Sequence, residues 1–188
     1  DEARRLGADW LIRVSKDRRI QTPAGSQSLF SYARHLAAVA DRNVLVRRKG
    51  GAGPEAVHLC VAAGRVSVPP SSHEPAYRGC APIDCWVVRT WEDPPPAGVE
   101  PLEWLLCTSL SCATGPQMMF AAEGYACRWM IEEFHKCEKT GCQVEMRRLE
   151  HVDRLEPLIG LLSVLAVWLL QLKFAAREQP QEPARTQL

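Results

Sequence analysis

The 188-residue chain changes character near residue 113, and this change constrains its fold more than any other feature. Upstream, β-rich runs are separated by loops rich in Pro, Ser and Gly, which is typical of short strands joined by turns. Downstream, the spacing is helical to about Ala176. We therefore predict an α+β fold in which a mostly antiparallel β part is followed by long helices.

Within this frame the expected order is strand, β-rich insert, strand, long helix and second helix. A turn at Gly64 is expected to split one β segment into a hairpin. The spacing of apolar residues predicts a helix over 28–40. The expected strands cover residues 9–14, 57–68, 83–91 and 104–108. The expected domain boundaries give a core part at 1–19, a β-rich insertion at 20–96, the remaining core at 97–176 and a polar tail at 177–188.

The overall charge gives no support to nucleic-acid binding. Lys and Arg number 23 against 22 Asp and Glu, for a net charge of +1, whereas a basic domain is the usual footprint of a nucleic-acid binder. Basic residues nevertheless gather locally, and such clusters are either solvated faces or DNA contacts. They are Arg4, Arg5, Arg13, Lys16, Arg18, Arg19, Arg47, Arg48, Lys49, Arg147 and Arg148.

The eight cysteines include three pairs with a Cys-x4-Cys spacing, which is wider than the usual zinc knuckle. The chain opens on charged residues rather than on a signal peptide. We therefore predict reduced, partly buried thiols in the cytosol, with a small zinc protein as an alternative. The apolar run 158–172 is shorter than the roughly 20 residues that span a membrane, so it predicts a buried core helix.

Residues 125–142 carry the most informative pattern. On a single helix, the polar residues would share one narrow stripe, opposite an apolar face of Cys127, Ile131 and Phe134. One carboxylate among cations suits a metal ligand beside phosphate-binding groups. A solvated helix face with incidental ion pairs is the other interpretation, and His135 falls on the flank. The stripe consists of Tyr125, Arg128, Glu132, Lys136 and Lys139.

The spacing of Tyr125, Arg128, Glu132 and Lys139 resembles the signature of bacterial DDE transposases of the insertion-sequence-four family, which includes the transposon-five transposase. The residues around Glu132 and the segment 101–106 also resemble that family. The similarity covers residues 10 to about 173 and is weakest in the β-rich part. The resemblance implies a partial RNase H-like fold with a mostly antiparallel β insertion before the helix that bears the glutamate.

The resemblance also implies roles for individual residues. Glu132 would be the catalytic glutamate, the third carboxylate of the triad, and would help to hold Mg²⁺ or Mn²⁺. Trp104 would stack on a flipped base, unless it is an ordinary core residue of its strand. The implied DNA contacts are Tyr125, Arg128, Lys139 and Arg13, with Lys136 and Arg148 as further candidates.

The implied protein is a cut-and-paste transposase that cleaves and joins DNA strands. Its partners would be transposon-end and target DNA and, in the full-length family, a second copy. A membrane and a small-molecule substrate are not expected, and the location would be the bacterial cytoplasm at the nucleoid. The first two aspartates of the triad are not visible, and Asp1 does not replace them. We therefore expect a fragment that does not cleave DNA alone.

Two further interpretations stay open beside the zinc protein. A catalytically dead remnant would bind transposon-end DNA, or inhibit full-length transposase by pairing with it, without cleaving. Its DNA binding would depend on salt. An unrelated interaction module would carry the stripe by coincidence.

Overall fold

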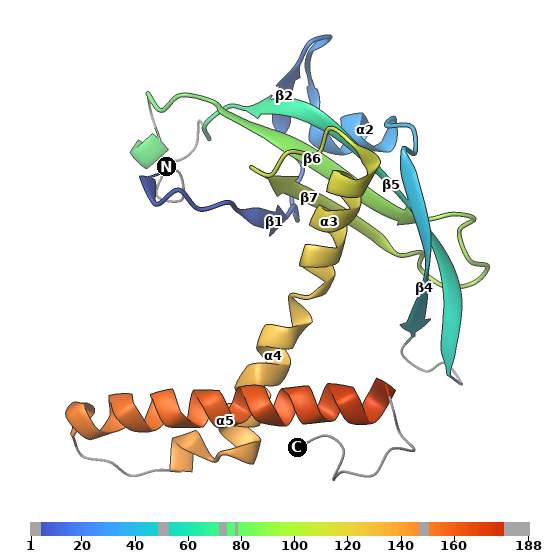
Figure 1. The fold of residues 1–188 in the computed structure, drawn as a ribbon. Helices are drawn as coiled ribbons and strands as arrows, with labels where there is room; N and C mark the ends of the chain where they lie inside the picture. Colours follow the sequence, from blue (N-terminus) through green and yellow to red (C-terminus); the bar gives the residue numbers. More distant parts are fainter. Residues whose placement is uncertain (1–4, 49–52, 72–74, 78, 147–150, 179–188) are drawn as a thin grey trace. The chain divides into compact units, whose positions relative to one another are not determined.

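The computed structural model describes residues 5–48, 53–71, 75–77, 79–146 and 151–178 (Figure 1). The chain divides into two compact units, residues 1–125 and 126–188. The first unit holds the sheet and the second holds the later helices. The fold is thus of the mixed α+β type, as predicted, and its sheet is antiparallel.

A seven-stranded sheet organises the first unit. Along its main path the order is β1-β7-β6-β5-β2-β3, and β4 pairs with β5 beside that path. The strands are β1 (Leu11–Arg13), β2 (Arg19–Thr22), β3 (Gly25–Ser28), β4 (Ala40–Arg47), β5 (Pro54–Val68), β6 (Ile83–Glu92) and β7 (Glu103–Thr108). Strands predicted in separate sequence segments thus lie in one sheet.

The central strands of the sheet are covered on both faces. Because successive side chains of a strand point to opposite sides, each central strand contributes to two buried layers. Helix α2 (Leu29–Arg34) packs on one face and helix α3 (Gly115–Ala126) on the other (Figure 1). On β6, Val87 joins the α2 side and Val88 the α3 side, and both are fully buried. On β7, Cys107 lies on the α2 side and Leu106 on the α3 side. Each fully buried Val or Leu side chain contributes about 1.5–3 kcal/mol of transfer free energy.

The prediction of a hairpin at Gly64 is wrong, because β5 continues through this residue as one strand from Pro54 to Val68. The glycine instead makes room for an aromatic side chain. A Cβ atom at Gly64 would overlap the hydroxyl of Tyr32 and lie 2.8 Å from its Cζ atom. Close packing against α2 therefore explains this glycine.

Helix α2 is shorter than the sequence predicts. Ser28 caps it, since its Oγ accepts a hydrogen bond from the Ser31 amide at 3.1 Å. The same Oγ donates to Asp17 at 2.7 Å. The helix ends at Arg34, and strand β4 has begun by Ala40, within the range predicted as helix.

The single helix expected over 125–142 is also interrupted. Helix α3 ends at Ala126, and α4 (Trp129–Lys136) begins after a turn at Cys127 and Arg128. Here the amides of Met130 and Ile131 donate to carbonyls three residues earlier. A π-helical turn (Cys137–Gly141), a 3₁₀ turn (Val144–Met146) and α5 (Val152–Glu178) follow.

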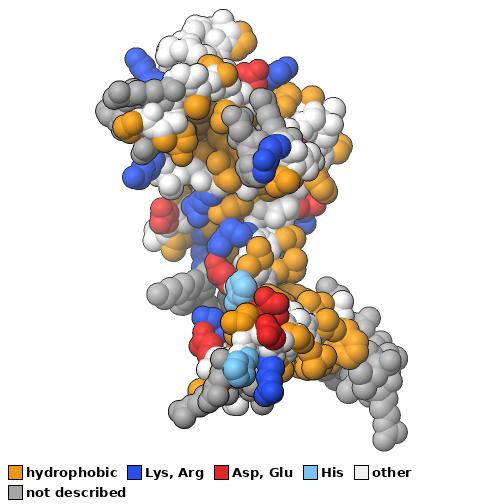
Figure 2. All heavy atoms as spheres, turned by 90° about the vertical axis from the view of Figure 1, so that its left-hand side faces the viewer, with side chains coloured by type: hydrophobic (Ala, Val, Ile, Leu, Met, Phe, Trp, Pro, Cys, Tyr) orange, Lys and Arg blue, Asp and Glu red, His pale blue; other side chains and the backbone are white. Residues whose placement is uncertain are grey.

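Helix α5 is not the buried core helix that its composition predicts. Of its most apolar window, 17% is buried, and Leu161 and Trp168 are each 60% exposed. Figure 2 shows apolar side chains at the surface of the second unit. Within the described ranges, residues 152–176 form the only helix long and apolar enough to cross a membrane. Length and composition are weak grounds for a span, because core helices of soluble proteins also meet them.

The boundary between the two units falls between Tyr125 and Ala126. The domain boundaries predicted at 19/20 and 96/97 refer to parts of a larger family fold and stay a prediction. Most of the predicted tail, from residue 179, lies outside the described residues, as does Arg148.

Candidate nucleic-acid interface

In the second unit, the predicted stripe has an exposed centre. Arg128 donates to the carboxylate of Glu132, one helical turn later, at 2.5 Å. Their side chains are 54% and 64% exposed. Exposed i,i+4 pairs of this kind contribute only about 0.3–0.5 kcal/mol, so this ion pair adds little to the stability of the fold.

Two lysines extend the same stretch of chain. Lys136 is exposed on the last turn of α4. Lys139 lies in the π-helical turn and pairs with Glu145 at 2.9 Å, which raises the pKa of the lysine. Four residues of the predicted stripe thus remain at the surface of this unit, and none is packed into its interior.

The prediction of a buried apolar face opposite the stripe is only partly confirmed. Ile131 is 60% exposed and Cys127 is exposed, whereas Phe134 is half-buried. Contacts with α5 explain which side faces inward, since Lys173 pairs with Glu133. Ser163 also donates to Glu138 at 2.8 Å. Trp129 of α4 also packs edge to face against Phe174 of α5, with ring centroids 5.6 Å apart. Polar and aromatic contacts thus both hold α4 and the following π-helical turn against α5.

Two other predicted DNA contacts meet in the first unit. Trp104 on β7 packs edge to face against Tyr125 at the end of α3, with ring centroids 6.0 Å apart. Both are half-buried and border the cluster on the α3 side of the sheet. The core interpretation of Trp104 thus accounts for its packing. Because Tyr125 and Glu132 belong to different units, their common stripe stays a prediction.

Arg13 is the last residue of β1 and lies opposite Leu106 of β7 in the sheet. It is exposed and lines a hollow of about 730 Å³ on the α2 side of the sheet. His135, expected on the flank, lies 3.2 Å from Glu138 and is exposed.

Among the described residues, no three His, Cys, Asp or Glu side chains come together as metal ligands. Glu132 offers a single carboxylate, and it pairs with the guanidinium of Arg128. A magnesium ion in a protein usually needs further carboxylate, water or phosphate oxygens. The side chains described in this chain therefore do not form a metal site by themselves.

All eight cysteines are free thiols. Cys85 and Cys107, on neighbouring strands, form a hydrogen-bonded pair in the core, which lowers the pKa of Cys85 and raises that of Cys107. Burial raises the pKa of Cys112 to about 11. Buried, protonated thiols are poor nucleophiles, which agrees with a packing role.

Alkylation should separate these thiols. Iodoacetamide at mildly alkaline pH is expected to modify the exposed Cys80 and Cys127 quickly and to leave Cys112, which is 0% exposed, unmodified. Peptide mass spectrometry would give the order, and concentrated urea should make all eight react. Rapid modification of Cys112 in the folded chain would contradict this packing.

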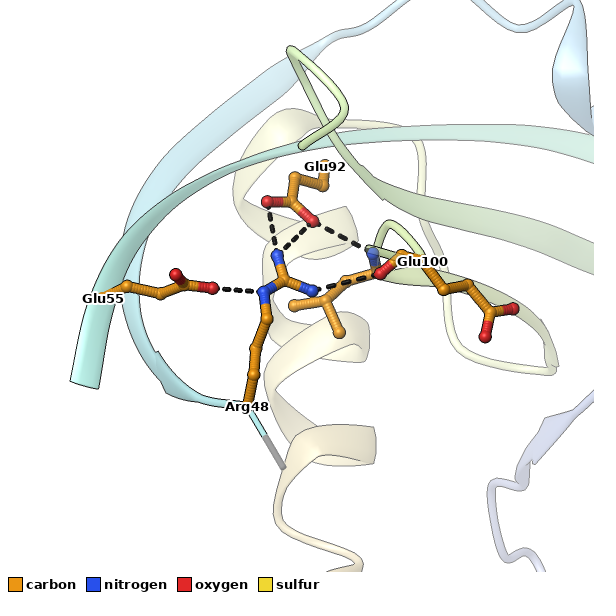
Figure 3. Close-up of polar contacts among 5 residues, drawn as sticks. Arg48, Glu55, Glu92 and Glu100 are labelled. Carbon is orange, nitrogen blue, oxygen red and sulfur yellow. Dashed lines mark hydrogen bonds and ion pairs between the residues drawn. The ribbon is translucent and has the colours of Figure 1, made fainter. Parts of the chain in front are cut away.

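The sequence did not indicate the role of Arg48. This residue belongs to a basic cluster, yet its guanidinium binds Glu92 through two bonds of 2.6 and 2.7 Å, contacts Glu55 and donates to the carbonyl of Glu100 at 3.1 Å (Figure 3). Arg48 thus joins the β4–β5 end to the loop before β7. Glu92 is the last residue of β6, and nothing in the sequence pattern indicated that it pairs with Arg48.

No protein-family model matches the chain.

Proposed function

We propose that this chain is part of a cut-and-paste DNA transposase of the DDE class and that its second unit contacts the DNA backbone near the scissile phosphate. The observation that supports the proposal most is the exposed Glu132 carboxylate with Arg128 one turn before it and Lys136 one turn after it. Positive side chains around one acid suit phosphate binding beside a catalytic carboxylate.

In this proposal the two units form part of an RNase H-like catalytic domain with a β insertion. Glu132 would be one ligand of Mg²⁺ or Mn²⁺, and the other carboxylates would come from residues beyond this chain. Arg128 and Lys139 would hold phosphates, Arg as a planar donor and Lys as a point charge. Trp104 and Tyr125 would meet the transposon end. The protein would act on transposon-end and target DNA in the bacterial cytoplasm, as a homodimer at full length.

The binding test compares charge changes in α4 and in the turns on either side of it. The double change Arg128→Gln and Lys139→Gln is expected to weaken binding of transposon-end duplex about tenfold or more and to lower the salt slope by nearly 2. Glu132→Gln should leave binding equal or tighter, because it removes a negative charge. Fluorescence anisotropy across a salt series measures both. Arg65→Gln, an exposed β5 residue, is the control.

The cleavage test uses the same duplex with Mg²⁺. The chain alone is expected to bind the duplex without cutting it. Cleavage by the purified chain would contradict the expectation that Glu132 needs the other two carboxylates of the triad. If the Arg128 and Lys139 variant binds the duplex with unchanged affinity, the proposed interface is wrong. In a full-length transposase carrying these residues, Glu132→Gln should abolish cleavage and retain binding.

A further inference from the structure

The α2 face of the sheet carries a hollow that is separate from the stripe around Glu132. A hollow of about 730 Å³ lies within the first unit, between the β1–β2 segment and the loop after β5. Its apolar lining consists of the half-buried Trp10 and Pro69, the exposed Pro70 and, at the floor, the buried thiol pair Cys85 and Cys107. Trp104 and Tyr125 border the cluster on the opposite face of the sheet, so the hollow is separate from them.

Four cations line the hollow on one short segment. All four are exposed, and within the described part of the chain none forms an ion pair. The Arg18 guanidinium is close enough to lower the pKa of the Cys107 thiol, against the larger effects that raise it. The four residues are Arg13, Lys16, Arg18 and Arg19.

The one acid of this segment does not neutralise them by pairing. Asp17 accepts from the Ser28 hydroxyl at 2.7 Å and from the amides of Arg18 and Phe30 at 2.9 and 3.0 Å. The Ser28 hydroxyl, followed by these amides, holds the pKa of Asp17 below its usual value. Asp17 therefore fixes the segment to the start of α2, and an excess of positive charge stays at the rim.

We propose that this hollow binds a single strand of DNA, with phosphates at the cationic rim and bases against the apolar floor; this rests on the proposed function. A cationic groove with an aromatic platform is the usual arrangement for single strands. The rim cations are all exposed, whereas small-ligand sites rely on a few convergent polar groups in a buried pocket. A duplex presents its phosphates on a convex surface and would touch only the rim.

The test is a matched pair of double variants in the full chain. Lys16→Gln with Arg18→Gln removes two rim cations, and Arg65→Gln with Arg154→Gln removes two exposed cations elsewhere. The first pair is expected to weaken binding of a short oligothymidine about tenfold or more and to lower the salt slope by about 1.4, because each single-strand phosphate contact adds about 0.7. The second pair should change neither.

Three outcomes would overturn the inference: equal losses in both double variants, no loss in the first, or displacement of the oligothymidine by pyrophosphate at comparable concentration. The proposed function is judged separately, by Arg128→Gln with Lys139→Gln and the duplex. If only the Arg128 and Lys139 variant loses affinity, the transposase proposal stands and the single-strand site is rejected. If only the Lys16 and Arg18 variant loses affinity, the single-strand site stands and the proposed transposase interface is rejected. Circular dichroism checks that each variant folds.

Discussion

Replacing Arg48 by methionine is expected to lower the melting temperature of the chain by several degrees. The Glu92 side chain is only 7% exposed, and Arg48 supplies two of its hydrogen bonds. Without Arg48, the carboxylate keeps the Leu102 amide at 3.1 Å and has no described cation beside it. A buried charge that loses its partner is strongly destabilising. Thermal unfolding followed by circular dichroism at neutral pH measures the loss.

The effect should depend on pH with a defined sign. Burial raises the pKa of Glu92, but the hydrogen bonds from Arg48 and Leu102 and the charge of Arg48 together hold it below its usual value. In the wild type this stabilisation is therefore present above about pH 4.3 and is lost as the pH falls. In Arg48→Met burial dominates, so protonation of Glu92 relieves the strain on the fold. The difference between the two proteins should narrow in acid.

A second change separates a lost ion pair from lost packing. Arg48→Met with Glu92→Met removes both charges and should recover much of the melting temperature, because apolar residues can replace a buried pair at little cost. Arg65→Met, at an exposed site, should have almost no effect. A double variant no more stable than Arg48→Met would show that the charge of Glu92 is not the cause.

Gly64→Ala is expected to destabilise the chain by about 1–3 kcal/mol, the usual cost of overpacking a core. The new methyl group would overlap the Tyr32 hydroxyl and lie 2.8 Å from Cζ, so the ring or the strand must move. Urea unfolding of the single variant gives the magnitude.

A double-mutant cycle tests whether Tyr32 is the cause. Tyr32→Ala has its own cost, but in that background Gly64→Ala should become nearly neutral. Gly160→Ala is the control, because nothing lies within 4 Å of a Cβ there and alanine favours helices. Equal costs of Gly64→Ala in both backgrounds would contradict the proposed overlap.

The sequence predicted the strands whose side chains alternate between two buried layers. The segment 83–91 became β6, and 104–108 became β7, because Val, Trp and Leu fill both faces of the sheet. The mixed α+β class followed from the same patterns. These features depend on local periodicity, which a single sequence carries.

The features that the sequence missed depend on distant partners. Gly64 resembles a turn residue until Tyr32 is placed above it, 32 positions earlier in the chain. The inward side of α4 is set by Lys173 and Phe174 on another helix, which contact Glu133 and Trp129. The composition of α5 indicated burial, but the described residues cover only part of its surface. The stripe around Glu132 was found from spacing alone, and its nucleic-acid role remains a prediction.

The pairing of β1 with β7 has a consequence for synthesis of the chain. The Thr108 hydroxyl donates to the carbonyl of Trp10, 98 positions away. A ribosome adds about 5–20 residues each second, so β1 emerges roughly 5–20 s before its partner exists. Because β7 lies between β6 and β1, a nascent chain that forms β2 to β6 in that interval would leave an edge of β6 unpaired. Strand β7 must therefore arrive before β1 can join the sheet, and any ribosomal pause between them prolongs exposure to aggregation.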